Sequence, residues 1–355
     1  MFQKKPENVK TKDPISKKKK IWLTILLSLS SIVFAITIYG VYLYSKAEAV
    51  VQDSYEEIER GTSENNAASN LREEAVNPIE DNVSILIIGV DDSAKRGFEE
   101  KSRSDVLILA TFNKEQGNVK LVSIPRDTHT FVPEINAYTK INHAHFHGGP
   151  KASIETVENF LNVPVDYYIR LNFEAFIQVV ETLDGVYYDV PFELYEMDSK
   201  DRANAIHLNA GYQKLTGEEA LALARTRKYD SDIERGQRQQ ELIKSIVKRT
   251  ASISSLFKLG DLIEAVGNNM ITNLQFDEMR SFLSYGLKQN LAIQSITLEG
   301  NGGYMDDGLW YYQVHEDSRL AVEKELREHM DLPIDTDRYP NASMELNSSG
   351  NYLKE

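Results

Sequence analysis

The sequence predicts an α/β protein: a single domain with a mixed central sheet between helices, preceded by one N-terminal transmembrane helix. A long uncharged run stands near the N-terminus. After it, short β-branched apolar runs typical of buried strands are mixed with amphipathic runs typical of helices. These runs follow no regular strand–helix–strand alternation, which favours a mixed sheet. We therefore divide the chain into a basic tail (1–20), a transmembrane helix (21–44), a stalk (45–81), a folded domain (82–332) and a polar tail (333–355).

The N-terminal apolar run is long enough to cross a membrane. It extends from Ile21 to Tyr44, and as a helix these 24 residues would span about 36 Å, more than the ~30 Å of a hydrocarbon core. Eight lysines precede it and acidic residues follow it, so the positive-inside rule predicts a cytoplasmic N-terminus and an extracellular domain. A cleaved signal peptide is the alternative, because Ala47-Glu48-Ala49 resembles a cleavage site. Signal peptides, however, have apolar segments of only about 7–15 residues.

The remaining elements are expected in the following order. Residues 51–60 extend the first helix beyond the membrane, and residues 64–81, rich in Asn, Ser, Glu and Pro, form a solvated linker. Strands are expected at 84–90, 106–112, 119–124, 167–171, 185–190, 293–298 and 311–314. Helices are expected at 153–161, 173–183, 217–224, 233–252, 255–265, 276–289 and 318–330, and Thr216-Gly217-Glu218-Glu219 has capping-box spacing at the start of the third. From Asp335 onward the polar sequence is expected to be unstructured.

Composition excludes several classes of protein. The chain has no cysteine, which excludes thiol catalysis, thiolate zinc sites and disulfides. Its net charge is −14 although its first 20 residues are basic, so the remaining chain is strongly acidic. Such a body repels nucleic acid, and no nucleic-acid partner is expected. Any anionic ligand would have to bind at a local cluster of cations.

Two carboxylates stand where predicted strands end. Asp91 directly follows the apolar strand that ends in Gly89-Val90, and Asp105 in Arg103-Ser104-Asp105 directly precedes the next strand. If the two strands pair antiparallel, Asp91 and Asp105 lie at the same end of the sheet and could share one Mg²⁺ ion. Asp91 could instead be a turn residue or a helix N-cap, and Arg103 with Asp105 could be a surface ion pair of little energetic weight.

A third segment, Ser123-Ile124-Pro125-Arg126-Asp127, ends another apolar strand. Proline fixes the direction in which the chain leaves the strand, which makes Arg126 a well-placed donor. Lys140-Ile141-Asn142-His143 follows, with further histidines at 145 and 147. Strand-like alternation would place the three imidazoles on one face and could suggest zinc. No nearby carboxylate completes a zinc spacing, so we favour loop histidines beside Gly148-Gly149.

The fourth segment contains four arginines close together: Arg225, Arg227, Arg235 and Arg238, with Gln239 beside the last. Arg225 and Arg227 cannot share a helix face, so the preceding helix must end near Ala224, whereas Arg235 and Gln239 do share one. A salt-bridged surface turn involving Asp230 and Asp232 is the alternative. Arginine forks, however, bind phosphoryl oxygens bidentately, which lysine does poorly.

Together, and in this order, these segments resemble the LytR-CpsA-Psr family, and the LytR-like branch of Gram-positive bacteria in particular. The motifs are Gly89-Val90-Asp91, Arg103-Ser104-Asp105, Ser123-Ile124-Pro125-Arg126-Asp127, Lys140-Ile141-Asn142-His143 and Arg225-Thr226-Arg227 with the segment 235–239. The resemblance covers about residues 84–330 and makes 82–332 the catalytic domain.

The resemblance implies an Mg²⁺-dependent phosphotransferase, with Mn²⁺ as a possible substitute. It would move a glycopolymer, such as a teichoic acid or capsular chain, from a polyprenyl pyrophosphate carrier to N-acetylmuramic acid of peptidoglycan. The implied metal ligands are Asp91 and Asp105, and Arg126 is the implied catalytic arginine. The implied substrate-binding residues are Arg103, Lys140, Arg225, Arg227, Arg235 and Gln239. An apolar tunnel between sheet and helices would hold the lipid. Many members have an arginine where this chain has Ser93, so Lys95 or Arg96 could replace it.

Three other functions are compatible with parts of this pattern. A lipid pyrophosphatase would use the same metal and arginines with water as the acceptor. A non-catalytic carrier-lipid binding protein would keep the tunnel but would not need both aspartates. A membrane-bound transcriptional attenuator is disfavoured by the acidic body and by the predicted topology.

Overall fold

The computed structural model describes residues 17–58, 60, 69–78, 80–91, 102–229, 231–250, 259–267, 269–282 and 291–339. The chain divides into two compact units, one up to Lys46 and one from Ala47 onward. Helix α1 (Lys17–Ser54) contains the stretch from Ile21, with a mean hydropathy of 2.3, and within the described ranges it is the one helix that could cross a membrane by length and composition. It continues past the predicted membrane span, which ends at 44, and so confirms part of the predicted extension; residues 45–54 contain neither glycine nor proline.

The second unit is built on a six-stranded sheet with the strand order β11-β6-β1-β2-β3-β12. The strands are β1 (Val83–Val90), β2 (Ser104–Asn113), β3 (Asn118–Ser123), β6 (Tyr167–Asn172), β11 (Met270–Thr272) and β12 (Ile293–Thr297). β1 pairs with β6 and β3 with β12 in parallel, while the other neighbours are antiparallel. The predicted mixed sheet is therefore confirmed.

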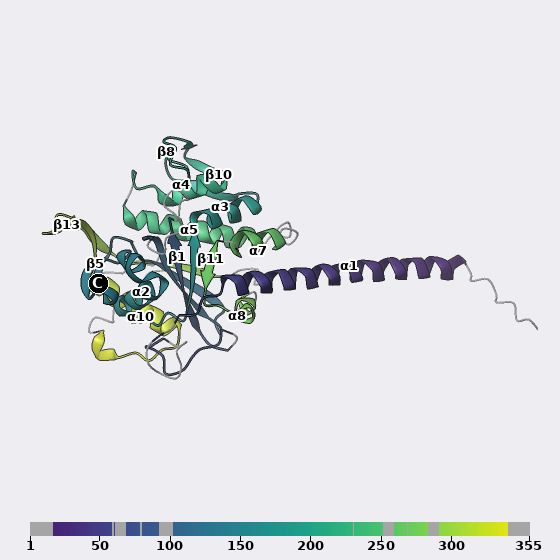
Figure 1. Ribbon diagram of the computed structural model, residues 1–355, viewed down its shortest axis with the longest axis horizontal. Helices are drawn as coiled ribbons and strands as arrows, with labels where there is room; N and C mark the ends of the chain where they lie inside the picture. Colours follow the sequence, from purple (N-terminus) through teal and green to yellow (C-terminus); the bar gives the residue numbers. More distant parts are fainter. Residues whose placement is uncertain are drawn as a thin grey trace, which may run out of the picture. The chain divides into compact units, whose positions relative to one another are not determined.

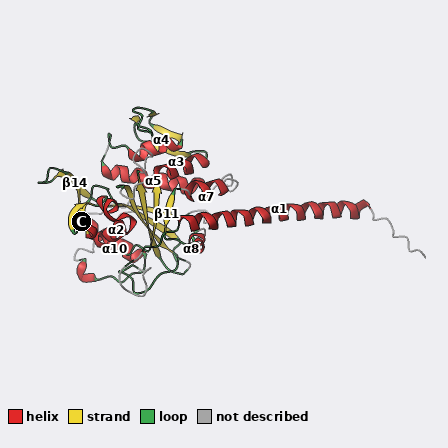
Figure 2. Cartoon of the chain, viewed as in Figure 1, coloured by secondary structure: helices red, strands yellow, loops and turns green. Residues whose placement is uncertain are grey.

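Helices cover both faces of this sheet (Figure 1). On one face α2 (His143–Leu161) and α10 (Glu316–His329) pack against residues such as Leu86, Leu107 and Leu109, which are at most 1% exposed. The other face lies under α5 (Asp232–Thr250) and the short α8 (Phe276–Ser281). Figure 2 shows the strands between these two helical layers.

The two faces of the sheet are buried to different degrees. On the α5 side, Ile87, Val106 and Phe112 of β1 and β2 are only half-buried, as is Ile293 of β12. On the α2 side the neighbouring positions of β1 and β2 are almost fully buried. The covering of the sheet is therefore looser on the α5 side.

A second, smaller core lies on the outer side of α5. It contains α3 (Phe173–Thr182), α4 (Gly217–Arg225) and two short sheets, β7 (Val186–Val190) with β10 (Gly211–Leu215) and β8 (Leu194–Glu196) with β9 (Ile206–Leu208). The predicted capping box of α4 is present, with the Thr216 side chain accepting from the Glu219 amide. Helix α7 (Leu259–Gly267) packs on α3.

Two hairpins complete the unit near the end of β3. β4 (His129–Val132) pairs with β5 (Ala137–Lys140) across the 3₁₀ turn η1 (Pro133–Ile135), and β13 (Gly300–Tyr304) pairs with β14 (Trp310–Val314). Only β14 among these strands was predicted. A bridge between Thr128 and Tyr312 joins the two hairpins.

The structure corrects three predictions. Residues 51–60 were predicted to extend the first helix and residues 64–81 to form a solvated linker. The helix instead ends at Ser54, and the described residues after it pack on the domain: Ile58 joins the main core, Arg60 is buried against the Val165 carbonyl, and Ser69 of the linker is buried and bonds Glu158. Helix α2 begins at His143, ten residues before the predicted start at 153, and Gly148 and Gly149 kink it. The predicted polar tail contains the 3₁₀ turn η2 (Thr336–Arg338) and a buried Tyr339, whose hydroxyl bonds Glu323 on α10.

Candidate active site

The ends of three strands bring the predicted polar residues to one edge of the sheet. β1 and β2 pair antiparallel with Val90 opposite Ser104, so Asp91 and Asp105 lie at the same end, as predicted. β3 also pairs antiparallel with β2, so Arg126, three residues beyond Ser123, returns to this end. The side chains of Asp105 and Arg126 form a direct ion pair.

A register shift places Asp105 in this pair. Gly89 lies opposite Val106 and Val90 opposite Ser104, which leaves Asp105 as the additional residue on β2. Such a bulge twists the strand locally and turns the extra side chain out of the regular alternation. The Asp105 side chain is 24% exposed and therefore remains open to a ligand.

Asp127 is the centre of an ion-pair network. Its carboxylate accepts from Lys140 at 2.8 Å and from Arg227 at 2.7 Å, and the Arg126 Nε atom lies 3.6 Å away. The Asp127 side chain is only 6% exposed, whereas its three basic partners are 20–38% exposed. The buried carboxylate thus holds three cations whose outer parts face solvent.

The turn between α4 and α5 supplies the other arginines. The Arg225 guanidinium lies 4.0 Å from Asp91 and stacks over the Phe173 ring at 4.9 Å. Asp232, at the start of α5, pairs with Arg235 at 2.8 Å and lies 3.6 Å from Arg227. Arg126 of the third sequence segment and Arg225, Arg227 and Arg235 of the fourth therefore lie with the predicted carboxylates in one cluster at one edge of the sheet.

Two residues at the base of this turn hold its backbone. Arg238 donates to the carbonyls of Leu223 and Thr226 at 3.1 and 2.9 Å, and Gln239 donates to that of Ala224 at 3.2 Å. These bonds satisfy carbonyls at the end of α4 that have no partner within the helix. The predicted end of the helix near Ala224 is confirmed. Gln239 is buried and bonded to backbone, and its predicted contact with a substrate stays a prediction.

The charges of the cluster are stable at neutral pH. Burial works against the Arg126 cation, but Asp105 and Asp127 outweigh it and raise the pKa of Arg126. Burial likewise opposes the Asp127 anion, yet the hydrogen bond from Lys140 and the charges of Arg227 and Arg126 lower the pKa of Asp127. Burial lowers the pKa of Arg235 to about 10, despite the neighbouring Asp232, which still leaves it protonated at pH 7.

The histidines lie beside this cluster in a different arrangement from the predicted one. His143, His145 and His147 are in the first turns of α2, so His145 does not share a face with the other two, and the alternation required for zinc is absent. His143 bonds Thr139 at 2.9 Å. Burial, with the charges of Arg103 and Lys140, lowers the pKa of His143 and keeps it neutral at pH 7. Arg103 is exposed at the entrance to β2.

The arrangement of carboxylates suits a metal that also takes ligands from its substrate. Among the residues the structure describes, no group of three or more His, Asp or Glu side chains could enclose an ion. Asp91 and Asp105 are at one end of the sheet, 16% and 24% exposed, and each has an arginine beside it. Mg²⁺ is commonly bound by one or two carboxylates together with substrate phosphates. The pair fits that pattern.

Asp127 had no predicted role and Asp232 only that of an ion-pair partner in the alternative surface turn, yet both organise the cations. A signal was present, because each is close in sequence to a candidate arginine, but a carboxylate near an arginine is common on any surface. The candidates Ser93, Lys95 and Arg96 lie outside the described residues.

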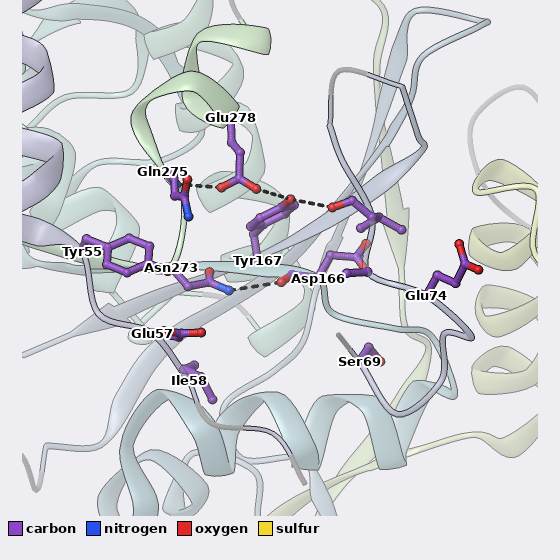
Figure 3. Close-up of a pocket in the computed structure, with 12 residues that line it drawn as sticks. Tyr55, Glu57, Ile58, Ser69, Glu74, Asp166, Tyr167, Asn273, Gln275 and Glu278 are labelled. Atoms are coloured by element: carbon purple, nitrogen blue, oxygen red, sulfur yellow. Dashed lines mark hydrogen bonds between the residues drawn. The ribbon is translucent and has the colours of Figure 1, made fainter. Parts of the chain in front are cut away.

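A separate polar pocket lies at the opposite end of the sheet, where β1 and β6 begin (Figure 3). Its cavity volume is about 130 Å³. The Tyr167 hydroxyl bonds Glu278 at 2.7 Å, and Asn273 donates to the Asp166 carbonyl. With Glu57 and Glu74 also in its wall, this pocket would repel an anion. The arginine cluster is therefore the candidate site for an anionic substrate.

Comparison with known proteins gives a consistent result. The model of the LytR_cpsA_psr family matches residues 41–328. An uncharacterised protein of Staphylococcus aureus is 40% identical over 315 residues, which are 88% of this chain and 76% of that protein. The Bacillus subtilis polyisoprenyl-teichoic acid–peptidoglycan teichoic acid transferase TagU is 36% identical over 317 residues, covering 89% of this chain and 97% of the relative.

The fold has a counterpart among solved structures. A LytR-CPS2A-psr family protein, YwtF (TagT), solved with bound octaprenyl pyrophosphate lipid, superposes with a TM-score of 0.61 at 30% identity. The match covers 78% of this chain and all of that structure.

Proposed function

This chain belongs to the LytR-CpsA-Psr family, and we propose that it transfers an anionic glycopolymer from a polyprenyl pyrophosphate carrier to N-acetylmuramic acid of peptidoglycan. The relatives named as teichoic acid transferases, and the related structure with bound octaprenyl pyrophosphate, support this function. The product is a phosphodiester between the glycopolymer and the sugar, and polyprenyl phosphate is released.

The observation that carries the proposal is the excess of positive charge at the sheet edge. Beside the carboxylates of Asp91, Asp105, Asp127 and Asp232 stand the basic side chains of Arg103, Arg126, Lys140, Arg225, Arg227 and Arg235. A pyrophosphate diester carries two negative charges, which this excess can balance. At about 4 Å and an effective dielectric near 20, each contact contributes on the order of 4 kcal/mol before desolvation. That suffices to offset the repulsion of a generally acidic body.

The chemistry requires one bond to form and one to break. The acceptor hydroxyl passes its proton to one of the carboxylates at the sheet edge, its oxygen bonds to the phosphorus next to the glycopolymer, and the bond from that phosphorus to the bridging oxygen breaks. Negative charge develops on the oxygens of the transferred phosphoryl group and on the departing polyprenyl phosphate. Arg126, Arg227 and Arg235 are held in place by Asp127 and Asp232 before substrate binds, so they can stabilise this charge with little rearrangement.

We further propose that Asp91 and Asp105 hold Mg²⁺ together with oxygens of the pyrophosphate. When bound there, the ion supplies additional positive charge next to the phosphoryl oxygens.

The looser face of the sheet is our candidate for the lipid tail. Ile87, Val106, Phe112 and Ile293 leave apolar surface partly exposed between the sheet and α5. A polyprenyl chain would cover such surface, at about 0.8 kcal/mol per buried CH₂ group. Opposite, the α2 side is already closed by fully buried residues.

The protein is proposed to act on the outer surface of the cell membrane. Eight lysines precede the apolar run Ile21–Tyr44 and acidic residues follow it, which by the positive-inside rule supports an extracellular second unit. The membrane helix holds the site near its lipid substrate and raises the effective substrate concentration.

The test is a single-turnover assay with the full-length protein in lipid nanodiscs. A polyprenyl pyrophosphate donor is mixed with a peptidoglycan glycan acceptor, and the phosphodiester product and released polyprenyl phosphate are measured. Formation of both in equal amounts supports the transferase. Release without a product linked to the acceptor would instead identify a pyrophosphatase, and retention of intact donor would identify a passive lipid-binding protein.

A further inference from the structure

A row of aromatic rings extends away from the arginine cluster on the outer face of the β4–β5 hairpin. The register places His129 opposite Lys140 and Phe131 opposite Tyr138, so these four side chains share one face. The ring centroids of His129 and Tyr138 are 5.7 Å apart, and those of Phe131 and Tyr138 are 5.4 Å apart. We call His129, Phe131 and Tyr138 the aromatic strip.

The strip is continuous with the candidate active site. Lys140, at the near end of the same face, bonds Asp127 in the arginine cluster. The Tyr311 ring of β14 closes the junction, 5.6 Å from the Lys140 ammonium and 4.9 Å from the His129 ring. The bridge between Thr128 and Tyr312 holds β14 beside β4.

The far end of the strip is exposed to solvent. Tyr138 is 69% exposed, although a tyrosine on a small hairpin could bury its ring at a gain in stability. Exposed aromatic side chains that lie together mark binding surfaces. Flat rings of this kind stack on the C–H faces of pyranose sugars, whose hydroxyls then bond neighbouring polar groups.

The charges around the strip restrict its partner. Glu134 lies in the turn joining β4 to β5, and Asp307 bonds the Tyr311 hydroxyl at 2.7 Å. These carboxylates would repel a polyanionic glycopolymer and an anionic membrane surface. An uncharged chain of sugars meets no such repulsion.

We propose that the aromatic strip binds the glycan strand of the acceptor, as an uncharged run of β-1,4-linked N-acetylhexosamines that leads into the arginine cluster. This inference rests on the proposed transferase function and adds a location for its second substrate. The glycan would lie along β4–β5 so that one sugar hydroxyl reaches the phosphoryl group near Lys140 and Arg126, while the anionic donor approaches from elsewhere on the cluster.

The first test measures binding alone, so that it does not depend on transfer. Full-length protein in nanodiscs is titrated with a soluble N-acetylhexosamine oligomer. Tyr138→Ala is expected to weaken binding by about 2- to 12-fold, the range that corresponds to one aromatic contact. Tyr138→Phe keeps the ring and should bind like the wild type. Tyr212→Ala is the matched control, since Tyr212 is 73% exposed and stacked on Tyr187 in a different sheet.

The second test separates acceptor from donor. In the transfer assay, Tyr138→Ala should raise the KM for the glycan acceptor and leave both kcat and the KM for the lipid donor unchanged. A raised donor KM with an unchanged acceptor KM would overturn the proposal in favour of a donor site. Equal glycan binding by Tyr138→Ala and the wild type would also overturn it.

Two further outcomes are distinguishable. If the wild type binds the glycan through Tyr138 but never forms the phosphodiester, the proposed transferase function is wrong and the proposed glycan-binding surface is still supported.

A third test compares the amide hydrogen exchange of residues 129–140 with and without the glycan oligomer, and in a bilayer and in detergent micelles. Protection that appears on adding the oligomer supports the proposal, whereas protection already produced by the bilayer, relative to detergent micelles, would show that the strip faces lipid and would refute it.

Discussion

Single guanidinium groups are expected to control the rate of transfer. Replacing Arg126, Arg227 or Arg235 by alanine removes a charge-assisted donor from a preorganised site, and such a donor is typically worth about 10² to 10³ in rate. Lysine should restore only part of the activity because it keeps the charge and loses the planar fork. The measurement is single-turnover transfer from a polyprenyl pyrophosphate donor.

Lys244→Ala provides the control for these arginine variants, since Lys244 lies on α5 and pairs with Glu241 away from the cluster. Near-normal transfer by the three arginine variants would remove the basis of the proposed mechanism.

The two carboxylates at the sheet edge are expected to determine metal dependence. Asp91→Ala and Asp105→Ala should each abolish transfer and weaken the dependence of activity on Mg²⁺ concentration. Both side chains are partly exposed, so the melting temperature should change little. Activity is measured against Mg²⁺ concentration beside thermal unfolding, and full activity of both variants in chelator would exclude the metal role.

At the scale of elements, the position of α5 depends on one glycine. A Cβ atom at Gly236 would lie 2.8 Å from the Ser123 hydroxyl oxygen, so α5 approaches the end of β3 as closely as its backbone permits. Gly236→Ala should push the start of α5, with Asp232 and Arg235, away from the sheet. Overpacking of this kind costs about 1–3 kcal/mol, against about 1 kcal/mol gained in helix propensity.

The melting temperature and the transfer rate of Gly236→Ala are both measured. The transfer rate should fall even at temperatures at which the variant is fully folded. Gly303→Ala is the control, because a Cβ atom there meets nothing within 4 Å. An active and unchanged Gly236→Ala variant would show that the site tolerates a shift of α5.

The docking of α10 on the sheet should depend on pH through His329. This residue is 3% exposed, and it bonds Thr111 at 2.8 Å and Asn118 at 2.7 Å. Burial, with a contribution from Lys120, lowers the pKa of His329 to about 4. The unfolded chain, with a pKa near 6.5, therefore binds a proton more readily than the folded one between pH 6.5 and 4, so stability falls as the pH falls through that window.

The expected loss is roughly 3 kcal/mol between pH 6.5 and 4, measured as the free energy of unfolding against pH. His329→Gln retains polar groups but does not titrate, so its stability should vary less over this window even if it is lower throughout. Identical pH profiles for the variant and the wild type would contradict the role assigned to His329.

At the scale of the whole molecule, the membrane orientation can be tested directly. Protease added to intact cells from which the wall has been removed should degrade the second unit and leave only the lysine-rich N-terminus protected. The expectation rests on the basic residues before the apolar run Ile21–Tyr44 and the acidic ones after it. A protected second unit would reverse the orientation and refute the proposed extracellular function.

The sequence was sufficient to predict the strands of the central sheet except the three-residue β11, and the ends of α4 and α5, because these are encoded locally. Apolar runs, a capping box and the spacing of Arg225 and Arg227 each depend on residues a few positions apart. The same local signals were too weak for β4, β5, β8, β9 and β13, which are short strands whose residues are mostly half-exposed. The aromatic strip was missed for that reason.

The sequence by itself determined which residues could form the site, since the motifs around Asp91, Asp105, Arg126, Lys140 and Arg225 occur in order along the chain. Only the tertiary structure decided how they pair. Asp127 gathers Lys140 and Arg227 from segments 13 and 100 residues away, and the bulge beside Val90 turns Asp105 toward Arg126. The folded segment after α1 was likewise decided by long-range contacts, because the buried charge of Arg60 needs Glu158 and the carbonyl of Val165 as partners. Such pairings follow from the burial of charge in a shared space, which local sequence does not encode.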